Sequence, residues 1–243
     1  MTTDCIEAPV TARPATETSS VVLATPQTLA TARSTKIDLY QSFWMSVIGS
    51  VAGFCVETIY CLVKYGRLES RTSLLLIPFT VVYGAGAVAL YLVLRNIDKS
   101  KLPSVFVIGA LTGSVVEFLF SFLEEKIFGT VSWDYSGRFL SIGGRVCFWS
   151  AIMWGALSIA WVLLIQPLFQ KLIAKIPATA FKALTWRLFA FIALNAVISI
   201  AAVARWNMRL NGSSASNVVL VALDALFPDQ MMSQIYPNMV FGG

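Results

Sequence analysis

Two acidic side chains stand out in a chain that is otherwise strongly apolar. Glu57 ends the stretch Gly-Ser-Val-Ala-Gly-Phe-Cys-Val-Glu, and Glu117 ends the similar stretch Gly-Ala-Leu-Thr-Gly-Ser-Val-Val-Glu. On a helix, residues four apart share one face, so each glutamate lies on the same stripe as two glycines. Glycines at this spacing let two membrane helices approach closely. Each carboxyl group is therefore predicted to face a neighbouring helix or a polar cavity that binds a ligand or moves protons.

Two arginines are the nearest candidate partners for these carboxylates. Arg71 and Arg145 each stand at the start of the next predicted helix, on the same side of the membrane as the preceding glutamate. An unpaired carboxylate is costly inside a bilayer, and an ion pair would reduce that cost. Two interpretations stay open: two Glu–Arg pairs that only join helices, or a polar ligand site.

Aromatic residues accompany both acidic positions. Tyr83 and Trp154 each begin an aromatic-Gly-Ala step near the middle of the helix that follows a glutamate. The loop segment Trp133-Asp134-Tyr135-Ser136 is either a cover over the cavity or an interfacial aromatic belt with a turn. The predicted ligand site consists of Glu57, Glu117, Arg71, Arg145, Tyr83, Trp133, Asp134 and Trp154.

The composition indicates a protein that crosses the membrane several times. Of its 243 residues, 57% are hydrophobic and 13% are charged, against about 25% charged residues in soluble domains. The chain has no histidine, which excludes His-based catalysis and His-ligated haem or zinc. Its four cysteines, Cys5, Cys55, Cys61 and Cys147, form no Cys-x-x-Cys pair. Three of them fall in or beside apolar stretches, which favours small buried apolar side chains over a disulfide or metal site.

Other motifs of chemistry are missing from the sequence. There is no Gly-x-x-x-x-Gly-Lys-Ser/Thr phosphate loop, so the chain is not expected to hydrolyse nucleotide by itself. There is also no Gly-x-Ser-x-Gly elbow or His-Glu-x-x-His helix. No cofactor and no metal site are predicted. The net charge of +5 favours contact with anionic lipid headgroups over nucleic-acid binding.

The predicted fold is an all-α membrane bundle with five transmembrane helices. They are placed at residues 40–63, 73–94, 103–123, 145–165 and 186–206, with Pro78 kinking the second. Residues 1–35, rich in Thr, Ala, Ser and Pro, are predicted to be a disordered tail, and 36–243 the transmembrane domain. A short helix at 217–227 is expected within a C-terminal segment, 211–243, that lies at the interface or folds back on the bundle.

The two glutamate stretches indicate a tandem repeat of two-helix hairpins. Repeat A covers residues 40–95 and repeat B covers 103–165. Because each unit crosses the membrane twice, both units start on the same side and are parallel repeats. The two glutamates should then lie at equal depth. Lys and Arg are almost equally divided between the two sides, and an amino terminus on the inside is favoured.

Several short motifs occur together between residues 40 and 240: Glu57, Arg71, Pro78-Phe79, Tyr83-Gly84-Ala85-Gly86, Glu117, Trp133-Asp134-Tyr135-Ser136, Gly144-Arg145-Val146-Cys147, Trp154-Gly155 and Tyr236-Pro237-Asn238-Met239. Together they resemble the bacterial integral membrane proteins described as putative ABC-transporter type IV permeases. The chain has Ser70-Arg71-Thr72 where that family tends to have Asn-Arg-Gly, and Ser141 where an asparagine is common. These departures concern hydrogen bonding in two loops.

The resemblance implies a permease-like transmembrane subunit of an ABC-type transporter in the bacterial cytoplasmic membrane. Its expected partners are membrane lipids, a separate ATPase subunit, further copies of the chain and a substrate that the sequence does not identify. Two alternatives stay open. One is an intramembrane enzyme that acts on a lipid or lipid-linked substrate, with Glu57, Glu117 or Asp134 as general base. The other is a membrane partner protein that transports nothing.

Overall fold

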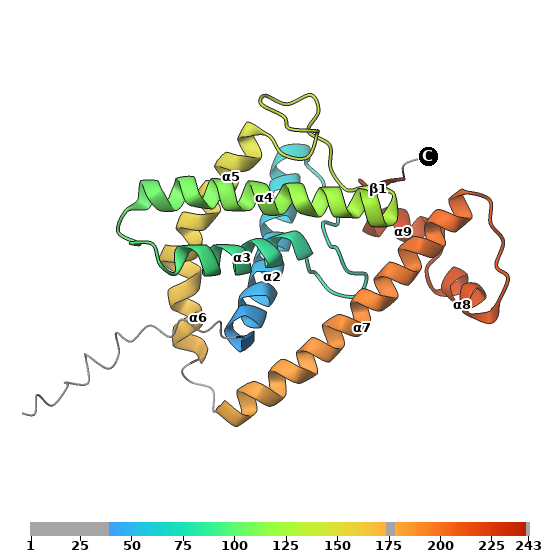
Figure 1. Cartoon of the computed structure of the whole chain (residues 1–243). Helices are drawn as coiled ribbons and strands as arrows, with labels where there is room; N and C mark the ends of the chain where they lie inside the picture. Colours follow the sequence, from blue (N-terminus) through green and yellow to red (C-terminus); the bar gives the residue numbers. More distant parts are fainter. Residues whose placement is uncertain (1–38, 174–177, 242–243) are drawn as a thin grey trace, which may run out of the picture. The chain divides into compact units, whose positions relative to one another are not determined.

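The computed structural model describes residues 39–173 and 178–241, and these are mostly helical (Figure 1). Four helical segments are long and apolar enough to cross a membrane: Leu39–Tyr65, Leu102–Phe128, Phe148–Lys171 and Thr179–Leu210. A fifth span results if Val218–Leu226 and Asp229–Ile235, bent by 59° relative to each other, are counted as one. The prediction of an all-α membrane protein is thus confirmed. The tail predicted at 1–35 lies outside the described residues.

The first two helices form a hairpin because glycines let them touch. Helix α2 spans Leu39–Tyr65 and helix α3 spans Val81–Leu94. A Cβ atom on Gly49 would overlap Ala87, and one on Gly84 would overlap the Ser50 hydroxyl. The close approach predicted from the glycine stripe is confirmed for this pair.

The second hairpin repeats this contact. Helix α4 spans Leu102–Phe128, and the following span consists of helix α5 (Phe148–Ala160), a π-helical turn η1 (Trp161–Ile165) and helix α6 (Gln166–Ile173). A Cβ atom on Gly109 would overlap Ser158, and one on Gly113 would overlap the Trp154 ring. Both glycine stripes therefore lie in helix–helix interfaces, while the duplication of the hairpins stays a prediction.

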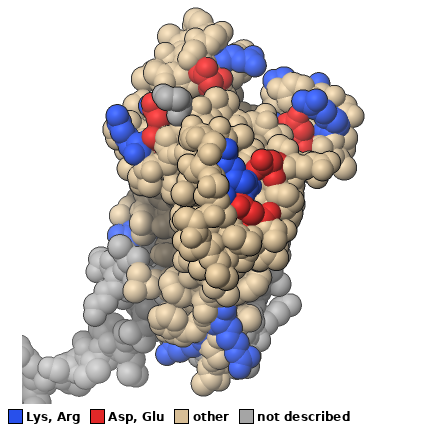
Figure 2. Space-filling model, turned by 90° about the vertical axis from the view of Figure 1, so that its right-hand side faces the viewer, with Lys and Arg blue, Asp and Glu red and all other residues tan. Residues whose placement is uncertain are grey.

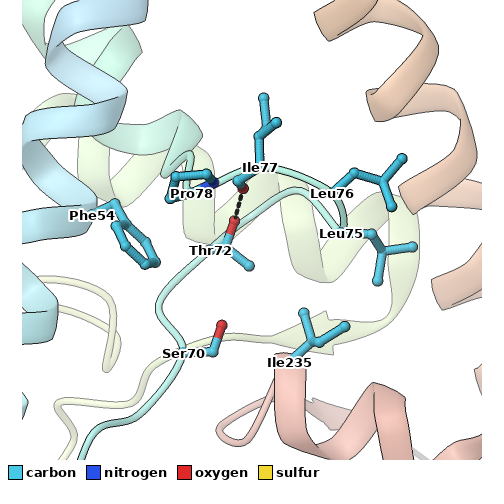
Figure 3. A pocket seen from close by; sticks show the side chains of 8 residues that line it. All are labelled: Phe54, Ser70, Thr72, Leu75, Leu76, Ile77, Pro78 and Ile235. Carbon is cyan, nitrogen blue, oxygen red and sulfur yellow. Dashed lines mark hydrogen bonds between the residues drawn. The ribbon is translucent and has the colours of Figure 1, made fainter.

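The connection between α2 and α3 differs from the prediction. The sequence predicts a kinked helix from residue 73 onward, but α3 begins only at Val81 and residues 66–80 are not helical. Pro78 lacks the N–H that a helix needs and disfavours helical geometry at the residue before it. In place of helical bonds, the Thr72 hydroxyl lies 2.7 Å from the Ile77 carbonyl oxygen (Figure 3) and accepts the Leu74 N–H at 3.2 Å.

This non-helical segment runs back along α2. The Thr80 N–H donates to the Ser50 carbonyl at 3.1 Å. At 1.5 Å per residue, Ser50 lies about 22 Å along the helix from its last residue, Tyr65. Non-helical backbone at such a depth in a membrane must find its hydrogen bonds within the protein. The prediction of a continuous second span was wrong because these bonds are available from elsewhere in the chain.

Helix α7 (Ala178–Leu210) supplies part of them. Its Ser199 hydroxyl accepts the Leu75 N–H at 2.9 Å, and its Asn195 amide oxygen accepts the Leu76 N–H at 3.4 Å. The Tyr236 hydroxyl donates to the Ser73 carbonyl at 3.3 Å. Ser199 and Asn195, in the apolar middle of α7, thus serve as hydrogen-bond acceptors for the non-helical segment 66–80.

The C-terminal segment packs against α7. It contains helix α8 (Val218–Leu226), helix α9 (Asp229–Ile235) and strand β2 (Val240–Phe241), which pairs antiparallel with strand β1 (Thr130–Val131). Met232 and Phe227 are buried against Val203 and Trp206 of α7. The segment therefore joins the loop after α4 to the far end of α7.

Candidate functional site

Glu57 is held by an aromatic residue of the neighbouring helix. The Tyr83 hydroxyl, in the first turn of α3, donates to Glu57 Oε1 at 2.9 Å. The ring of Tyr83 lies over Gly53, where a Cβ atom would overlap it. The glycine one helical turn before the glutamate therefore makes room for the ring whose hydroxyl reaches the carboxylate.

Glu117 has the same kind of neighbour. The Trp154 indole N–H donates to Glu117 Oε2 at 3.2 Å, and the Trp154 ring lies over Gly113. A second donor comes from the loop between α4 and α5, where the Tyr135 hydroxyl lies 3.1 Å from Glu117 Oε1. Glu117 is only 7% exposed and Trp154 only 5%. This carboxylate is thus enclosed by its own hairpin.

The two halves meet through their rings. The rings of Tyr83 and Trp154 stack, with centroids 5.3 Å apart and an interplanar angle of 28°. A Cβ atom on Gly86 would overlap the Trp154 ring, so α3 also approaches it closely. One continuous group of side chains results, which we call the carboxylate array: Glu57, Tyr83, Trp154, Glu117 and Tyr135.

Electrostatics agree with this arrangement. Burial raises the pKa of the Tyr135 phenol far above its usual range, and the carboxylates of Glu117 and then Glu57 raise it further. The phenol therefore stays protonated and acts as a hydrogen-bond donor at any physiological pH.

The two arginines do not bind these glutamates. Arg71 donates to the Cys61 sulfur at 3.0 Å and to Glu69 Oε2 at 3.1 Å. Arg145 donates to the Ser121 hydroxyl at 3.1 Å and forms an ion pair with Glu125. Among the described residues no ion pair includes Glu57 or Glu117, so the predicted Glu–Arg pairs are not formed.

The two arginines bind residues other than Glu57 and Glu117. Cys61 and Ser121 follow the two glutamates by one helical turn, so each arginine side chain binds one turn nearer the helix end. There Arg145 pairs with Glu125, whose side chain is 44% exposed, and Arg71 pairs with Glu69, whose side chain is 9% exposed. Burial lowers the pKa of Arg71, but the bond to Cys61 and the carboxylates of Glu57 and Glu69 outweigh it and raise that pKa. Arg71 thus acts on Glu57 without binding it.

The two loop residues chosen from the sequence do not touch the carboxylates. The Trp133 indole N–H donates to the Arg145 carbonyl at 2.9 Å. Asp134 is exposed and accepts the Ser136 N–H at 2.9 Å and the Ser136 hydroxyl at 2.6 Å, which lowers the pKa of Asp134. The residue between them, Tyr135, makes the contact with Glu117. It was missed as a site residue, although its phenol in the same motif is the signal that could have identified it.

A cavity of about 250 Å³ lies beside the non-helical segment (Figure 3). It is lined by Phe54, Ser70, Thr72, Leu75, Leu76, Ile77, Pro78 and Ile235, none of which belongs to the carboxylate array. Within the residues that the structure describes, no group of three or more Cys, Asp or Glu side chains is placed to hold a metal ion.

Comparison with known proteins gives one family. The model of the family described as putative ABC-transporter type IV matches residues 44–200, which is more than half of the chain. The match includes every residue of the carboxylate array. Comparisons with curated proteins and with solved structures give no match.

Proposed function

The chain belongs to the putative ABC-transporter type IV family, and we therefore propose that it is the membrane-spanning component of a transporter whose polar site is the carboxylate array. The observation that carries this proposal is the contact of two glutamates from different hairpins with one stacked Tyr83–Trp154 pair. Sites between hairpins are where membrane transporters commonly bind their cargo.

The chemistry of the array favours a cation. Its hydrogen-bond donors are neutral: one indole and two phenols. The nearby arginines have their own carboxylates, Glu69 and Glu125. A carboxylate in an apolar interior needs a proton or another positive charge close to it. Aromatic rings also attract cations. We infer that Glu57 and Glu117 bind protons or a positively charged substrate during transport.

Energy for transport would come from elsewhere. The sequence has no phosphate-binding loop, so the proposed transporter uses a separate ATPase subunit. We place the protein in the bacterial cytoplasmic membrane with its amino terminus inside. We also propose that the two hairpins are parallel repeats, since Gly53, Tyr83 and Glu57 make the contacts that Gly113, Trp154 and Glu117 make.

The test is transport by the purified protein in proteoliposomes, with its ATPase where one co-purifies. Protons and a panel of primary and quaternary amines serve as probes. For any probe that the wild type moves, Glu57→Gln and Glu117→Gln should each lower the rate by at least about tenfold, because a buried charged contact is lost.

Glu124→Gln is the matched control. Glu124 is also half-buried on α4 and accepts hydrogen bonds from Thr130 and Ser132, but it lies two turns beyond Glu117, outside the array. Its removal should leave the rate unchanged. If Glu57→Gln and Glu117→Gln transport every probe as the wild type does, the site assignment is wrong.

A further inference from the structure

Helix α7 has an apolar middle that is bounded by arginines. Residues 188–204 carry no charge, with Arg187 before them and Arg205 after them. At 1.5 Å per residue this stretch is about 26 Å long, close to the thickness of the hydrocarbon core of a bilayer. Arg187 and Arg205 therefore lie near the headgroups of opposite leaflets.

At the Arg205 end, the chain neutralises its own charges. The Arg205 guanidinium donates to Asp224 through Nε and Nη2, at 2.8 and 2.7 Å. Arg209 pairs with Asp224 and with Asp229, each at 2.6 Å. These basic groups are thus satisfied by α8 and α9.

At the Arg187 end, the described residues form no such acidic pairs. Lys182 and Arg187 of α7 and Lys171 of α6 are exposed, and no ion pair joins them to any other described residue. The sequence has no Asp or Glu between Asp134 and Asp224. On the face that Figure 2 shows, clusters of both signs lie in the upper half, and the basic side chains visible at the lower end have no acidic side chain visible beside them.

The three basic residues belong to one end of the structure. Only five peptide bonds separate Ile173, the last residue of α6, from Ala178, the first of α7. That connection cannot exceed about 18 Å. Lys171 and Lys182 are each close to it along their helices. The positive charges of Lys171 and Lys182 therefore lie close together at the surface of the protein.

Aromatic side chains place this end at a membrane surface. Trp186 is 62% exposed and stacks edge-on against Phe189, which is 49% exposed. The Lys182 ammonium lies 6.0 Å from the centre of the Tyr40 ring at the start of α2. Trp and Tyr are typical of the headgroup level, where the ring is in contact with lipid and the polar atom with water.

We propose that Lys171, Lys182 and Arg187 bind the phosphate groups of anionic phospholipids. The aromatic residues beside them favour a lipid over an acidic protein, because exposed rings at a helix boundary suit the bilayer interface. Anionic lipids are concentrated in the cytoplasmic leaflet. The site therefore assigns the start of α2 and α7 to the cytoplasmic side.

The test is lipid selection by the purified full-length protein. The protein is incubated in micelles with equal amounts of phosphatidylglycerol and phosphatidylcholine, and native mass spectrometry gives the ratio of the two bound lipids. Lys171→Gln/Lys182→Gln/Arg187→Gln should lower the preference for phosphatidylglycerol by on the order of 100-fold, about fivefold for each basic residue. Arg187→Gln alone should lower it by about fivefold.

The control is Lys64→Gln/Lys126→Gln/Arg138→Gln, which removes the same charge from residues that also form no ion pair among the described residues. Lys64 and Lys126 lie in the last turns of α2 and α4, and Arg138 lies in the loop after α4. This control variant should keep the wild-type ratio. Circular dichroism of each variant verifies the helical fold. Equal losses in both triple variants, or a wild-type ratio in the first, would overturn the proposal.

Discussion

The hairpin α2–α3 and the hairpin α4–α5 contain the same contacts made by different side chains. In each, a glycine of the first helix leaves room for a ring of the second, and that ring donates to a glutamate one turn after the glycine. In each, an arginine binds the residue one turn after the glutamate, Cys61 or Ser121. The recurring positions are those that combine close packing with a buried charge.

The hairpins differ in what surrounds the carboxylate. Glu117 has two donors, Trp154 and Tyr135, and both come from its own hairpin and loop. Glu57 has one donor, Tyr83. The non-helical segment 66–80 that connects α2 and α3 is hydrogen-bonded to α7. The second hairpin thus supplies more of the hydrogen bonds to its own glutamate, and we expect its side chains to contribute more to stability.

The largest effect should come from removing a ring. Trp154→Ala deletes the stack on Tyr83 and a donor to Glu117, and it should lower the free energy of unfolding by about 3–5 kcal/mol. Tyr83→Ala should lower it by less, because Tyr83 and Glu57 are only half-buried. Unfolding in lipid–detergent micelles measures both. Trp149→Ala, at a residue 61% exposed, is the control. A larger loss for Tyr83→Ala would reverse the comparison.

The next effect concerns the glycines beneath the rings. Gly53→Ala and Gly113→Ala place a methyl group into Tyr83 and Trp154, and each should cost about 1–3 kcal/mol of stability. Gly137→Ala is the matched control, since nothing lies within 4 Å of its Cβ position. Thermal unfolding of the three variants checks this. If Gly113→Ala is as stable as Gly137→Ala, Trp154 does not pack as described.

Removing a single hydrogen-bond donor should also cost more stability in the second hairpin than in the first. Trp154→Phe keeps a ring but leaves Glu117 Oε2 without its indole donor, at a cost of about 1–3 kcal/mol. Tyr83→Phe should cost less at the half-buried Glu57. Because the rings of Tyr83 and Trp154 are in contact, the losses in the double variant Tyr83→Phe/Trp154→Phe should not simply add, and additive losses would show that the two carboxylates are independent.

The smallest effect tests the residue that has no counterpart in the first hairpin. Tyr135→Phe removes the second donor to Glu117 and should lower stability by about 1 kcal/mol. Asp134→Asn, at the exposed neighbour, should change stability little. Chemical denaturation of the two variants gives the comparison. Equal stability of Tyr135→Phe and the wild type would mean that the loop does not close on Glu117.

The sequence predicted the parts of this structure that depend on local spacing. Glycines and glutamates four residues apart predicted the packed faces, and the aromatic-Gly-Ala steps identified Tyr83 and Trp154. It did not predict the arginine partners, because a long flexible side chain can reach several carboxylates near it in the sequence. It also did not predict that residues 66–80 leave the helix, since the bonds from Ser199 and Asn195 come from far along the chain.

A shared site for Glu57 and Glu117 requires the contact between the two hairpins. With the native cysteines replaced by serine, Tyr83→Cys/Trp154→Cys can be treated with a short bifunctional thiol reagent after a protease site is inserted in the loop between α4 and α5. Tyr83→Cys/Leu164→Cys is the control, because Leu164 also lies after the cleavage site but is 67% exposed in η1. The first pair should stay linked after cleavage, and the second should separate. Separation of the first pair would contradict a shared site for Glu57 and Glu117.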